Sequence, residues 1–145
     1  MRVLVINGPN LNMLGIREPE VYGAQSYAQL LAYIKKSAKA LNIQIACIQS
    51  NSEGEIVSAI QRAYGRMDGI VINPAAYTHT SVAILDALKA VALPAVEVHL
   101  SDVDAREPFR QLSYTSMACI ATVKGKGFAG YKEALEILAA RFEQS

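Results

Sequence analysis

Glutamate and histidine stand two positions apart in the segment EVHL, as Glu97 and His99. Side chains two positions apart in a β-strand point to the same side of the sheet. A carboxylate in this position can fix the tautomer of the imidazole, and an oriented imidazole is a common general acid or base. The pair therefore predicts proton-transfer chemistry at the end of a strand.

The second of the two histidines, His79, lies in the segment NPAAYTHTS, directly after the apolar run GIVIN. Asn73 ends that run, and the hydroxyl residues beside His79 also fit helix N-caps. Asn7 and Asn10 follow the first apolar run in the same way, although Asn-Gly-Pro also fits a plain turn. Hydrogen-bonding side chains thus cluster where buried strands are expected to end.

Three other kinds of site are weaker interpretations. Two histidines and one glutamate could bind a metal, but three ligands without a recognisable metal-ligand spacing are a weak signal. The segment GKGFAG (125–130) matches G-x-G-x-x-G, yet only 15 residues follow it, so no second strand can complete a dinucleotide site. Its glycines more simply predict a tight turn and close packing. His79 with Ser81 could suggest acyl transfer, but the G-x-S-x-G elbow is missing.

The elements that must position these residues alternate between strand and helix. Apolar, β-branched runs predict strands at 2–7, 43–49, 69–73, 94–100 and 117–123. Helical periodicity is present from an N-cap at Ser26 to Leu41, and at 50–64, 81–91 and 130–142. Repeated right-handed βαβ crossovers predict an α/β, flavodoxin-like three-layer sandwich with a five-stranded parallel sheet in the order 2-1-3-4-5.

Composition places the chain among compact globular domains. Its 145 residues suit one domain, 1–145, and 52% are hydrophobic, which hints that some apolar surface is buried between subunits. A net charge of +1 without a basic run argues against nucleic acid as a partner. The lack of a long apolar run or a signal-like start predicts no membrane association and a cytoplasmic location. Cys47 and Cys119 fit buried, reduced thiols.

Two long connections, 8–25 and 100–116, follow the first and fourth predicted strands. Long loops at the carboxyl ends of parallel strands usually carry function, so the strand-end residues should surround one crevice. The first loop adds Arg17 and Tyr22, and the second adds Arg106 and Arg110.

Five segments together resemble the type II 3-dehydroquinate dehydratase family. They are GPNLNMLGIREPEVYG (8–23), QSNSEGEIVSAI (49–60), NPAAYTHTSVA (73–83), EVHLSD (97–102) and AREPFR (105–110). The resemblance implies dehydration of 3-dehydroquinate to 3-dehydroshikimate through an enolate, in the shikimate or quinate pathway. It also implies a flavodoxin-like fold, no metal or cofactor, and a homo-oligomer, usually a dodecamer of four trimers.

The resemblance implies a role for each catalytic candidate. Tyr22 would be the base, made acidic by Arg17 on the same loop, because a nearby guanidinium favours the phenolate. Asn10 would hold a water against the enolate oxygen. His99 would protonate the leaving hydroxyl, with Glu97 orienting it. The loop at 17–25 would close over substrate as a lid.

The remaining residues would hold the substrate. Asn73, His79 and Arg110 would position the hydroxyls and the ring, and the backbone N–H groups of Leu100 and Ser101 would bind the carboxylate. Asp86 would reach the site of a neighbouring subunit, although it also fits an exposed helical residue. The chain departs from the family pattern at a few positions near the site and the expected contacts between subunits: Leu85, Asp102, Asp104, Gln111 and Leu112.

The alternative from another class is a flavodoxin-like binding or signalling domain that holds a nucleotide or a flavin at the same edge. A receiver-type module would need acidic residues after the first strand, where this chain has Asn-Gly-Pro-Asn. A flavin-binding protein would be yellow when purified.

Overall fold

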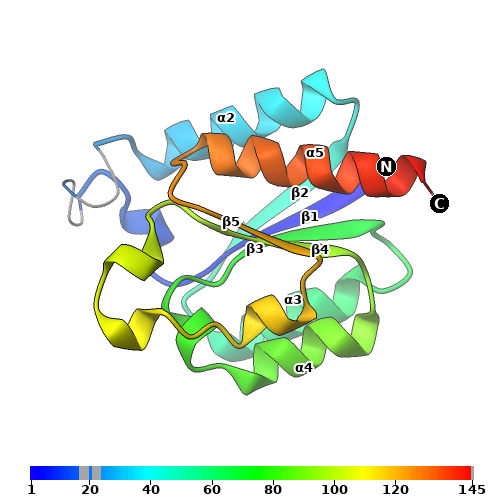
Figure 1. Cartoon of the computed structure of the whole chain (residues 1–145). Helices are drawn as coiled ribbons and strands as arrows, with labels where there is room; N and C mark the ends of the chain where they lie inside the picture. The colour runs from blue at the N-terminus through cyan, green and yellow to red at the C-terminus, as the bar shows by residue number, and fades with distance from the viewer. Residues whose placement is uncertain (17–19, 21–23, 145) are drawn as a thin grey trace.

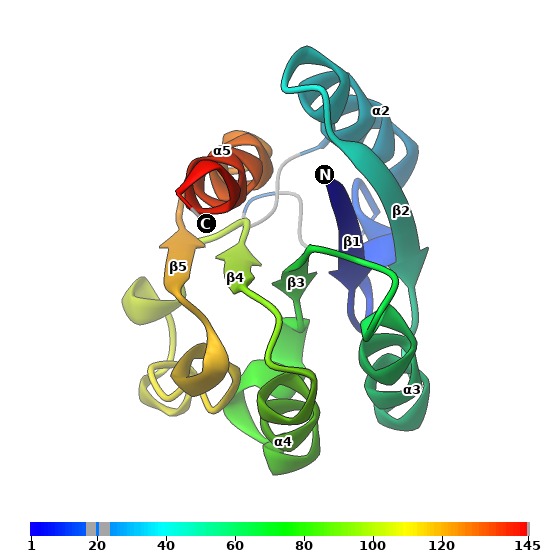
Figure 2. The ribbon, with the colours of Figure 1, turned by 90° about the vertical axis from the view of Figure 1, so that its right-hand side faces the viewer.

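The computed structural model describes residues 1–16, 20 and 24–144. Five parallel strands form one sheet in the order β2-β1-β3-β4-β5, which confirms the predicted topology. They are β1 (Arg2–Asn7), β2 (Gln44–Gln49), β3 (Gly69–Asn73), β4 (Ala95–His99) and β5 (Ala121–Lys124). Figure 2 shows these strands nearly end-on, between two pairs of helices.

Each face of the sheet is covered by two helices, because the central strands are apolar on both sides. Helices α2 (Tyr27–Ala40) and α5 (Ala129–Glu143) cover one face, and α3 (Glu53–Ala63) and α4 (Val82–Val91) cover the other (Figure 1). Alternate residues of one strand supply the two cores: Val3 and Val5 pack under the first pair, and Leu4 and Ile6 under the second. The result is the expected three-layer sandwich.

Serines begin three of the helices. Ser26 and Gln29 form a capping box at α2, with each side chain bonded to the other residue's backbone. Ser52 Oγ accepts from the Glu55 N–H at 3.2 Å, and Ser81 Oγ accepts from the Ile84 N–H at 2.9 Å. The predicted cap at Ser26 is therefore confirmed. Helix α3 begins later than the predicted range 50–64 because the preceding residues form its turn.

The start of the fifth strand differs from the prediction. Residues Thr115–Ala118 form a short 3-10 helix, η5, and β5 begins only at Ala121. Pairing with β4 starts where the Ile120 N–H donates to Ala95 O at 2.8 Å. The chain turns before this point, which brings Thr115 into the interior and leaves Met117 60% exposed. An apolar run alone could not distinguish this turn from a strand.

The connections at the carboxyl edge of the sheet contain the other short helices. These are η1 (Leu11–Met13), η2 (Ala75–His79), η3 (Val103–Ala105) and η4 (Pro108–Arg110). Both chain termini lie at the opposite edge (Figure 1). No helix in the described part of the chain is both long and apolar enough to cross a membrane.

Candidate active site

One cavity at the carboxyl edge collects most of the residues that the sequence singled out. Its empty space, including the part open to solvent, is about 600 Å³. The predicted residues that line it are Asn10, Asn73, His79, His99, Leu100, Ser101, Arg106 and Arg110. Small and apolar residues fill the wall between them: Pro9, Leu11, Ala75 and Ala76. The expected crevice beside the switch point of the sheet is therefore present.

Asn10 reaches the cavity from a left-handed backbone conformation, with φ of 69°. Its N–H donates to Asn51 Oδ1 at 3.0 Å. Gln49 Nε2 donates to Asn51 Oδ1 at 3.2 Å and to Gly8 O at 3.1 Å, which ties the loop after β1 to the loop after β2. Asn51 and Gln49 were not predicted as site residues. The signal was their position in QSN at the end of a strand, the same pattern that marked the other candidates.

Gly8 brings the backbones after β1 and β3 into contact. Its N–H donates to Asn73 O at 2.8 Å. A Cβ atom at this position would lie 2.7 Å from Pro74 O, which is closer than nonbonded atoms can approach. Glycine is therefore required here for close approach.

A buried phenol supports Asn73. Asn73 Nδ2 donates to the Tyr131 hydroxyl at 3.0 Å, and the Ala75 N–H donates to Asn73 Oδ1 at 3.1 Å. The Tyr131 hydroxyl donates in turn to Asn7 Oδ1 at 2.6 Å. Burial raises the pKa of Tyr131, so it stays a neutral donor. Asn7 thus has a structural role below the cavity, whereas Asn73 has one amide N–H left to face it.

His79 is held by the backbone of the second long connection. Its Nδ1 lies 2.7 Å from Leu112 O. A carbonyl oxygen can only accept, so Nδ1 carries the proton and Nε2 is left for a ligand. Ser81, and not a residue nearer to the strand, caps α4.

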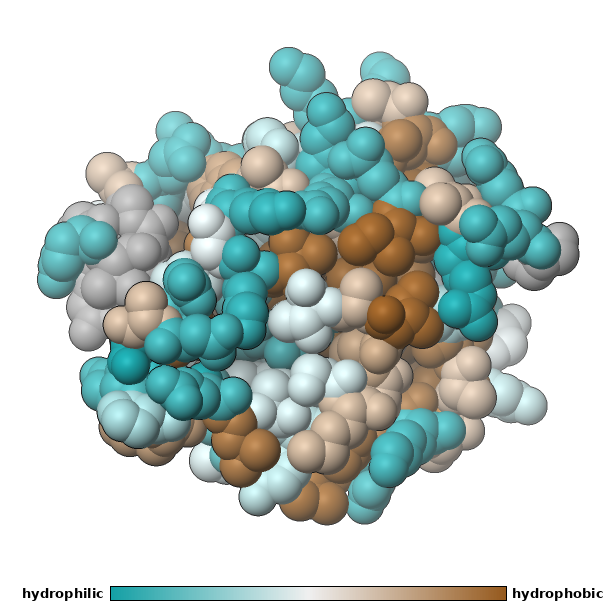
Figure 3. Space-filling model, viewed as in Figure 1, coloured by the Kyte–Doolittle hydropathy of each residue, from teal (hydrophilic) through white to brown (hydrophobic). Residues whose placement is uncertain are grey.

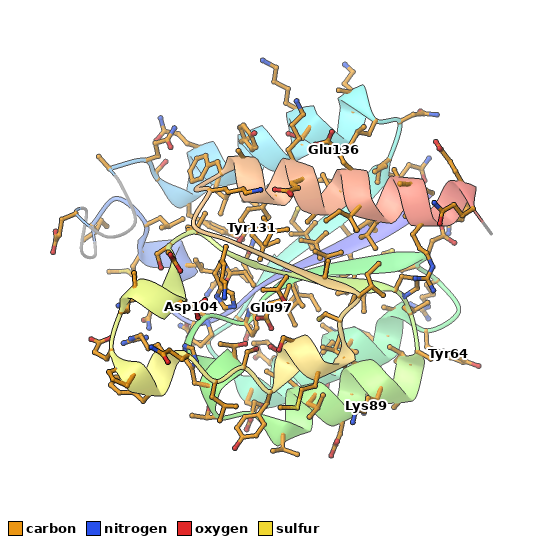
Figure 4. The ribbon with its side chains drawn as sticks, in the orientation of Figure 1. Tyr64, Lys89, Glu97, Asp104, Tyr131 and Glu136 are labelled. Atoms are coloured by element: carbon orange, nitrogen blue, oxygen red, sulfur yellow. The ribbon has the colours of Figure 1, made fainter. Side chains whose placement is uncertain are left out.

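Glu97 and His99 form a buried pair. His99 Nε2 lies 2.8 Å from Glu97 Oε2, and the two residues are 5% and 1% exposed. The bond places a proton on Nε2 and leaves Nδ1 for chemistry in the cavity. Glu97 itself lies behind His99 and does not line that cavity. Figure 4 shows Glu97 inside the fold, whereas Glu136 lies on the outer side of α5.

Three hydroxyls surround the Glu97 carboxylate on its other side. Thr78 Oγ1 donates to Oε1 at 3.0 Å, Ser113 Oγ lies 3.0 Å from Oε2, and Thr115 Oγ1 makes a short bond to Oε1. Burial raises the pKa of Glu97, but the hydrogen bonds from His99 and the threonines and the charge of His99 outweigh it, so the net pKa is lowered. The carboxylate is therefore ionised at neutral pH.

The glycine-rich turn at 125–127 supports the segment after β4. The Gly127 N–H donates to Leu100 O at 3.0 Å, and the Gly125 N–H donates to Ser101 O at 3.1 Å. Both glycines have positive φ, of 77° at Gly125 and 57° at Gly127. The prediction of a tight turn is confirmed, and close packing holds at Gly125, where a Cβ would lie 3.3 Å from Asp102 Cβ, but not at Gly127, where a Cβ would meet nothing within 4 Å.

The rim of the cavity is cationic. Arg106 and Arg110 both line it, and Arg110 Nε donates to Glu107 Oε2 at 2.6 Å. Nearby, Asp104 forms an ion pair with Lys124, and Asp102 Oδ1 accepts from the Asp104 N–H at 3.1 Å. Two guanidiniums at the rim of a polar cavity suit an anionic, hydroxylated ligand.

The structure does not bring every predicted residue to this cavity. Asp86 is exposed on α4, outside the cavity of its own chain. Tyr22 and Arg17, and most of the predicted lid at 17–25, lie outside the described residues. Cys47 and Cys119 are free thiols and are only partly buried. Within residues 1–16, 20 and 24–144, no three His, Cys, Asp or Glu side chains are grouped as metal ligands.

Known proteins similar to this chain identify its family. The family model described as dehydroquinase class II matches residues 1–139. A 3-dehydroquinate dehydratase from Clostridium perfringens is 55% identical over 139 residues, covering 95% of each chain. One from Fusobacterium nucleatum is 56% identical over 134 residues, covering 90% of this chain and 91% of the relative.

A solved structure gives the same result for the fold. The crystal structure of type II dehydroquinase from Butyrivibrio crossotus superposes with a TM-score of 0.93 at 50% identity, over 95% of this chain and 97% of the other. The chain therefore belongs to the class II dehydroquinase family.

Proposed function

We propose that this chain converts 3-dehydroquinate to 3-dehydroshikimate and water, in the shikimate or quinate pathway. The observation that carries the proposal is the buried Glu97–His99 pair, in which His99 lines a cavity with a cationic rim and Glu97 lies behind it. In a chain that matches the dehydroquinase family over residues 1–139, this pair has the composition of a general acid site.

The reaction needs a base for the C2 proton, a donor for the enolate oxygen and an acid for the C1 hydroxyl. Tyr22 would take the C2 proton as a phenolate, with Arg17 and Arg110 as the cations that favour its charged form. The C–H electron pair then forms the enolate. These assignments of Tyr22 and Arg17 rest on the family resemblance alone.

The second half of the reaction uses Asn10, His99 and Glu97, which all lie within the part of the chain that the structure describes. A water held by Asn10 would stabilise the enolate oxygen until the C1–O bond breaks. His99 Nδ1 would give its proton to the departing oxygen, so that water leaves and a C1–C2 double bond forms. Glu97 would stabilise the imidazolium before this transfer and fix the ring throughout.

Substrate binding would use the cavity wall. The backbone N–H groups of Leu100 and Ser101 would bind the carboxylate, helped by the arginines of the rim. Asn73, His79 and Arg110 would bind the hydroxyls and position the ring. The apolar wall beside Leu11 and Ala76 would exclude water from the reacting carbon atoms.

An ultraviolet assay tests the proposal directly. Purified protein is expected to convert 3-dehydroquinate to an absorbing enone, without added metal or cofactor and after dialysis against EDTA. Tyr22→Phe should abolish turnover while circular dichroism and binding of a substrate analogue stay largely unchanged. Absence of enone from the wild-type protein would contradict the proposed activity, and near-normal turnover by the variant would remove Tyr22 from its role.

The chain is also proposed to work as a homo-oligomer, a dodecamer of four trimers. Large apolar side chains are exposed around η4, η5, α4 and β5: Val82, Phe109, Leu112, Met117 and Ile120. Figure 3 shows apolar surface over β5 and between α5 and α4. Burial between subunits would cover this face and protect the edge strand.

Assembly would also give Asp86 its proposed role at a neighbouring subunit's site. Light scattering after size exclusion should give about twelve times the 15.7 kDa chain mass. A monomer at working concentration would contradict both the assembly and the role of Asp86.

A further inference from the structure

We infer that Thr78, Ser113 and Thr115 are positioning residues, which fix the Glu97 carboxylate and through it hold the His99 ring for proton delivery. The inference rests on the proposed function, since it gives the hydroxyls a purpose in that reaction. None of the three lines the substrate cavity, so none touches the reacting atoms.

The three hydroxyls converge on one carboxylate from different parts of the chain. Thr78 comes from η2, Ser113 from the connection before η5, and Thr115 from the first residue of η5. Thr78 Oγ1 lies 2.5 Å from Ser113 Oγ and 2.6 Å from Thr115 Oγ1. Thr78 and Thr115 are fully buried. Such a cluster leaves Glu97 little freedom to rotate.

The direction of the hydrogen bonds favours an anion at the centre. Ser113 Oγ accepts from the Ser116 N–H at 3.1 Å, so its own hydrogen is free to point to Glu97. Thr78 and Thr115 face Oε1, while Oε2 receives His99 Nε2. An ionised carboxylate donates none of these bonds, and each hydroxyl has one hydrogen, so when all three hydrogens point to Glu97 the short distances between the hydroxyl oxygens are close contacts and not further hydrogen bonds.

Other titratable groups surround the pair. A second, polar cavity beside it has about 440 Å³ of empty space and is lined in part by His79, Asp104, Arg110 and Lys124. Lys124 is ion-paired with Asp104, and Arg110 with Glu107. Behind the hydroxyls, Cys119 Sγ lies 3.3 Å from Thr115 O. Burial raises the pKa of Cys119 to about 12, so this thiol adds no charge at neutral pH.

The same segment also fixes the second histidine. Leu112 O accepts from His79 Nδ1, and the Tyr114 N–H donates to Thr78 O at 2.7 Å. The segment 112–115 therefore docks on η2 through its backbone and on Glu97 through its side chains. Both imidazoles of the site are oriented from this one segment.

A matched pair of substitutions at Thr115 separates the hydroxyl from the packing. Thr115→Val keeps the volume and removes the hydroxyl, whereas Thr115→Ser keeps the hydroxyl and leaves a methyl-sized gap. Thr115→Val should lower kcat at least about tenfold with KM within about twofold, because the acid acts in the chemical step and not in binding. Thr115→Ser should keep kcat within about twofold while its Tm falls.

The pH profile adds a readout that a packing defect would not move. Loss of the Thr115 hydrogen bond should shift the acid limb of kcat to higher pH in Thr115→Val, and Thr115→Ser should keep the wild-type limb. Wild-type kcat and an unshifted limb in Thr115→Val would overturn the inference. So would equal losses of kcat in both variants.

A crystal structure of each variant tests the positioning without any turnover. Thr115→Val should show the Glu97–His99 distance lengthened beyond 3.5 Å or the carboxylate rotated, and Thr115→Ser should keep the bond. An undisturbed pair in Thr115→Val would overturn the inference even if the wild type is active. Conversely, a wild type without enone production would remove the proposed function, while the displaced pair would still support positioning by the hydroxyls.

Discussion

Two regions of the same cavity are built in opposite ways. The loop after β1 is held by neutral amides at exposed or half-buried positions, with Asn51 and Gln49 bonded to the backbone around Asn10. The end of β4 carries a buried anion, with Glu97 surrounded by hydroxyls and an imidazole. A group that only orients water can remain neutral and exposed to solvent. A group that must hold and release a proton needs a buried charge held next to it.

Removing the charge of the buried region should have the largest effect. Glu97→Gln replaces the carboxylate by an amide of the same shape, so His99 loses its anionic partner and the hydroxyl cluster loses its central acceptor. We expect kcat to fall by about 10²–10⁴-fold, the usual contribution of a general acid. Steady-state enone production measures this loss.

Glu136→Gln is the matched control, since it makes the same chemical change at an exposed position on α5. It should keep wild-type kcat and unfolding free energy. Comparable activity in the two variants would remove the distinction between the regions.

Breaking the amide region should cost less. Asn51→Ala removes the acceptor for the Asn10 N–H and for Gln49 Nε2, so the loop that carries Asn10 loses one of its tethers. Loss of a direct oxyanion donor costs about 10²–10³-fold, and a residue acting through its neighbour should cost less, about tenfold in kcat.

Asn12→Ala is the graded control for this region. Asn12 lies on the same loop and, among the described residues, accepts a longer bond, of 3.3 Å, from Gln49 Nε2. The kcat of Asn12→Ala should stay within about twofold of wild type. If Asn12→Ala lost as much activity as Asn51→Ala, the effect would reflect general loosening of the loop and not the tether at Asn10.

The two regions should also respond differently to acid. The pKa of Glu97 is lowered in the fold from a reference value of 4.5, so between pH 4.5 and the folded pKa the unfolded chain binds more protons. Its stabilising contribution is complete above pH 4.5 and is lost as the pH falls through the folded pKa. The unfolding free energy of wild type relative to Glu97→Gln should therefore decline in acid.

Urea unfolding between pH 3.5 and 7 measures this difference. The difference between wild type and Asn51→Ala should stay flat over the same range, because an amide does not titrate. A flat curve for both variants would show that Glu97 is not preferentially ionised in the fold.

The smallest effect is expected at Cys119, beside the buried region. Burial, and to a lesser extent the charge of Glu97, raises its pKa from 9.0 to about 12. At pH 9 only about one native thiol in a thousand should be ionised, so iodoacetamide should label Cys119 only after unfolding. As the pH rises from 9 towards 12 the unfolded chain loses the Cys119 proton first, so the raised pKa destabilises the fold over this range. Fast labelling of Cys119 itself in the native protein at pH 9, distinguished from Cys47 by peptide mass mapping, would contradict the shift.

The strand order and the location of the cavity could be predicted from the sequence because both follow from short-range patterns. Alternating runs fix the topology, and polar residues at strand ends mark one edge of a parallel sheet. The three predicted residues Asn10, His79 and His99 do line one cavity at this edge. The sequence also predicts the start of α2 at Ser26, where the capping box has a local signature.

The hydroxyl cluster could not be predicted in the same way. Thr78 fitted a helix cap, and nothing in the local sequence shows that Ser113 and Thr115 return to Glu97 from the end of a long connection. The predicted start of the fifth strand was wrong for the same reason. The run around Met117 is apolar, but the chain turns there and buries Thr115. Contacts between distant segments decide both features.

The contact at Gly8 limits how the site can be redesigned. Even alanine would press a methyl group into Pro74 O, so a saturation library at this codon should return glycine alone among active clones. The loops after β1 and β3 therefore pack too closely for any side chain at position 8. Engineers who seek room for a bulkier substrate should enlarge the part of the wall near Val103, on the loop after β4, and leave the contact at Gly8 untouched.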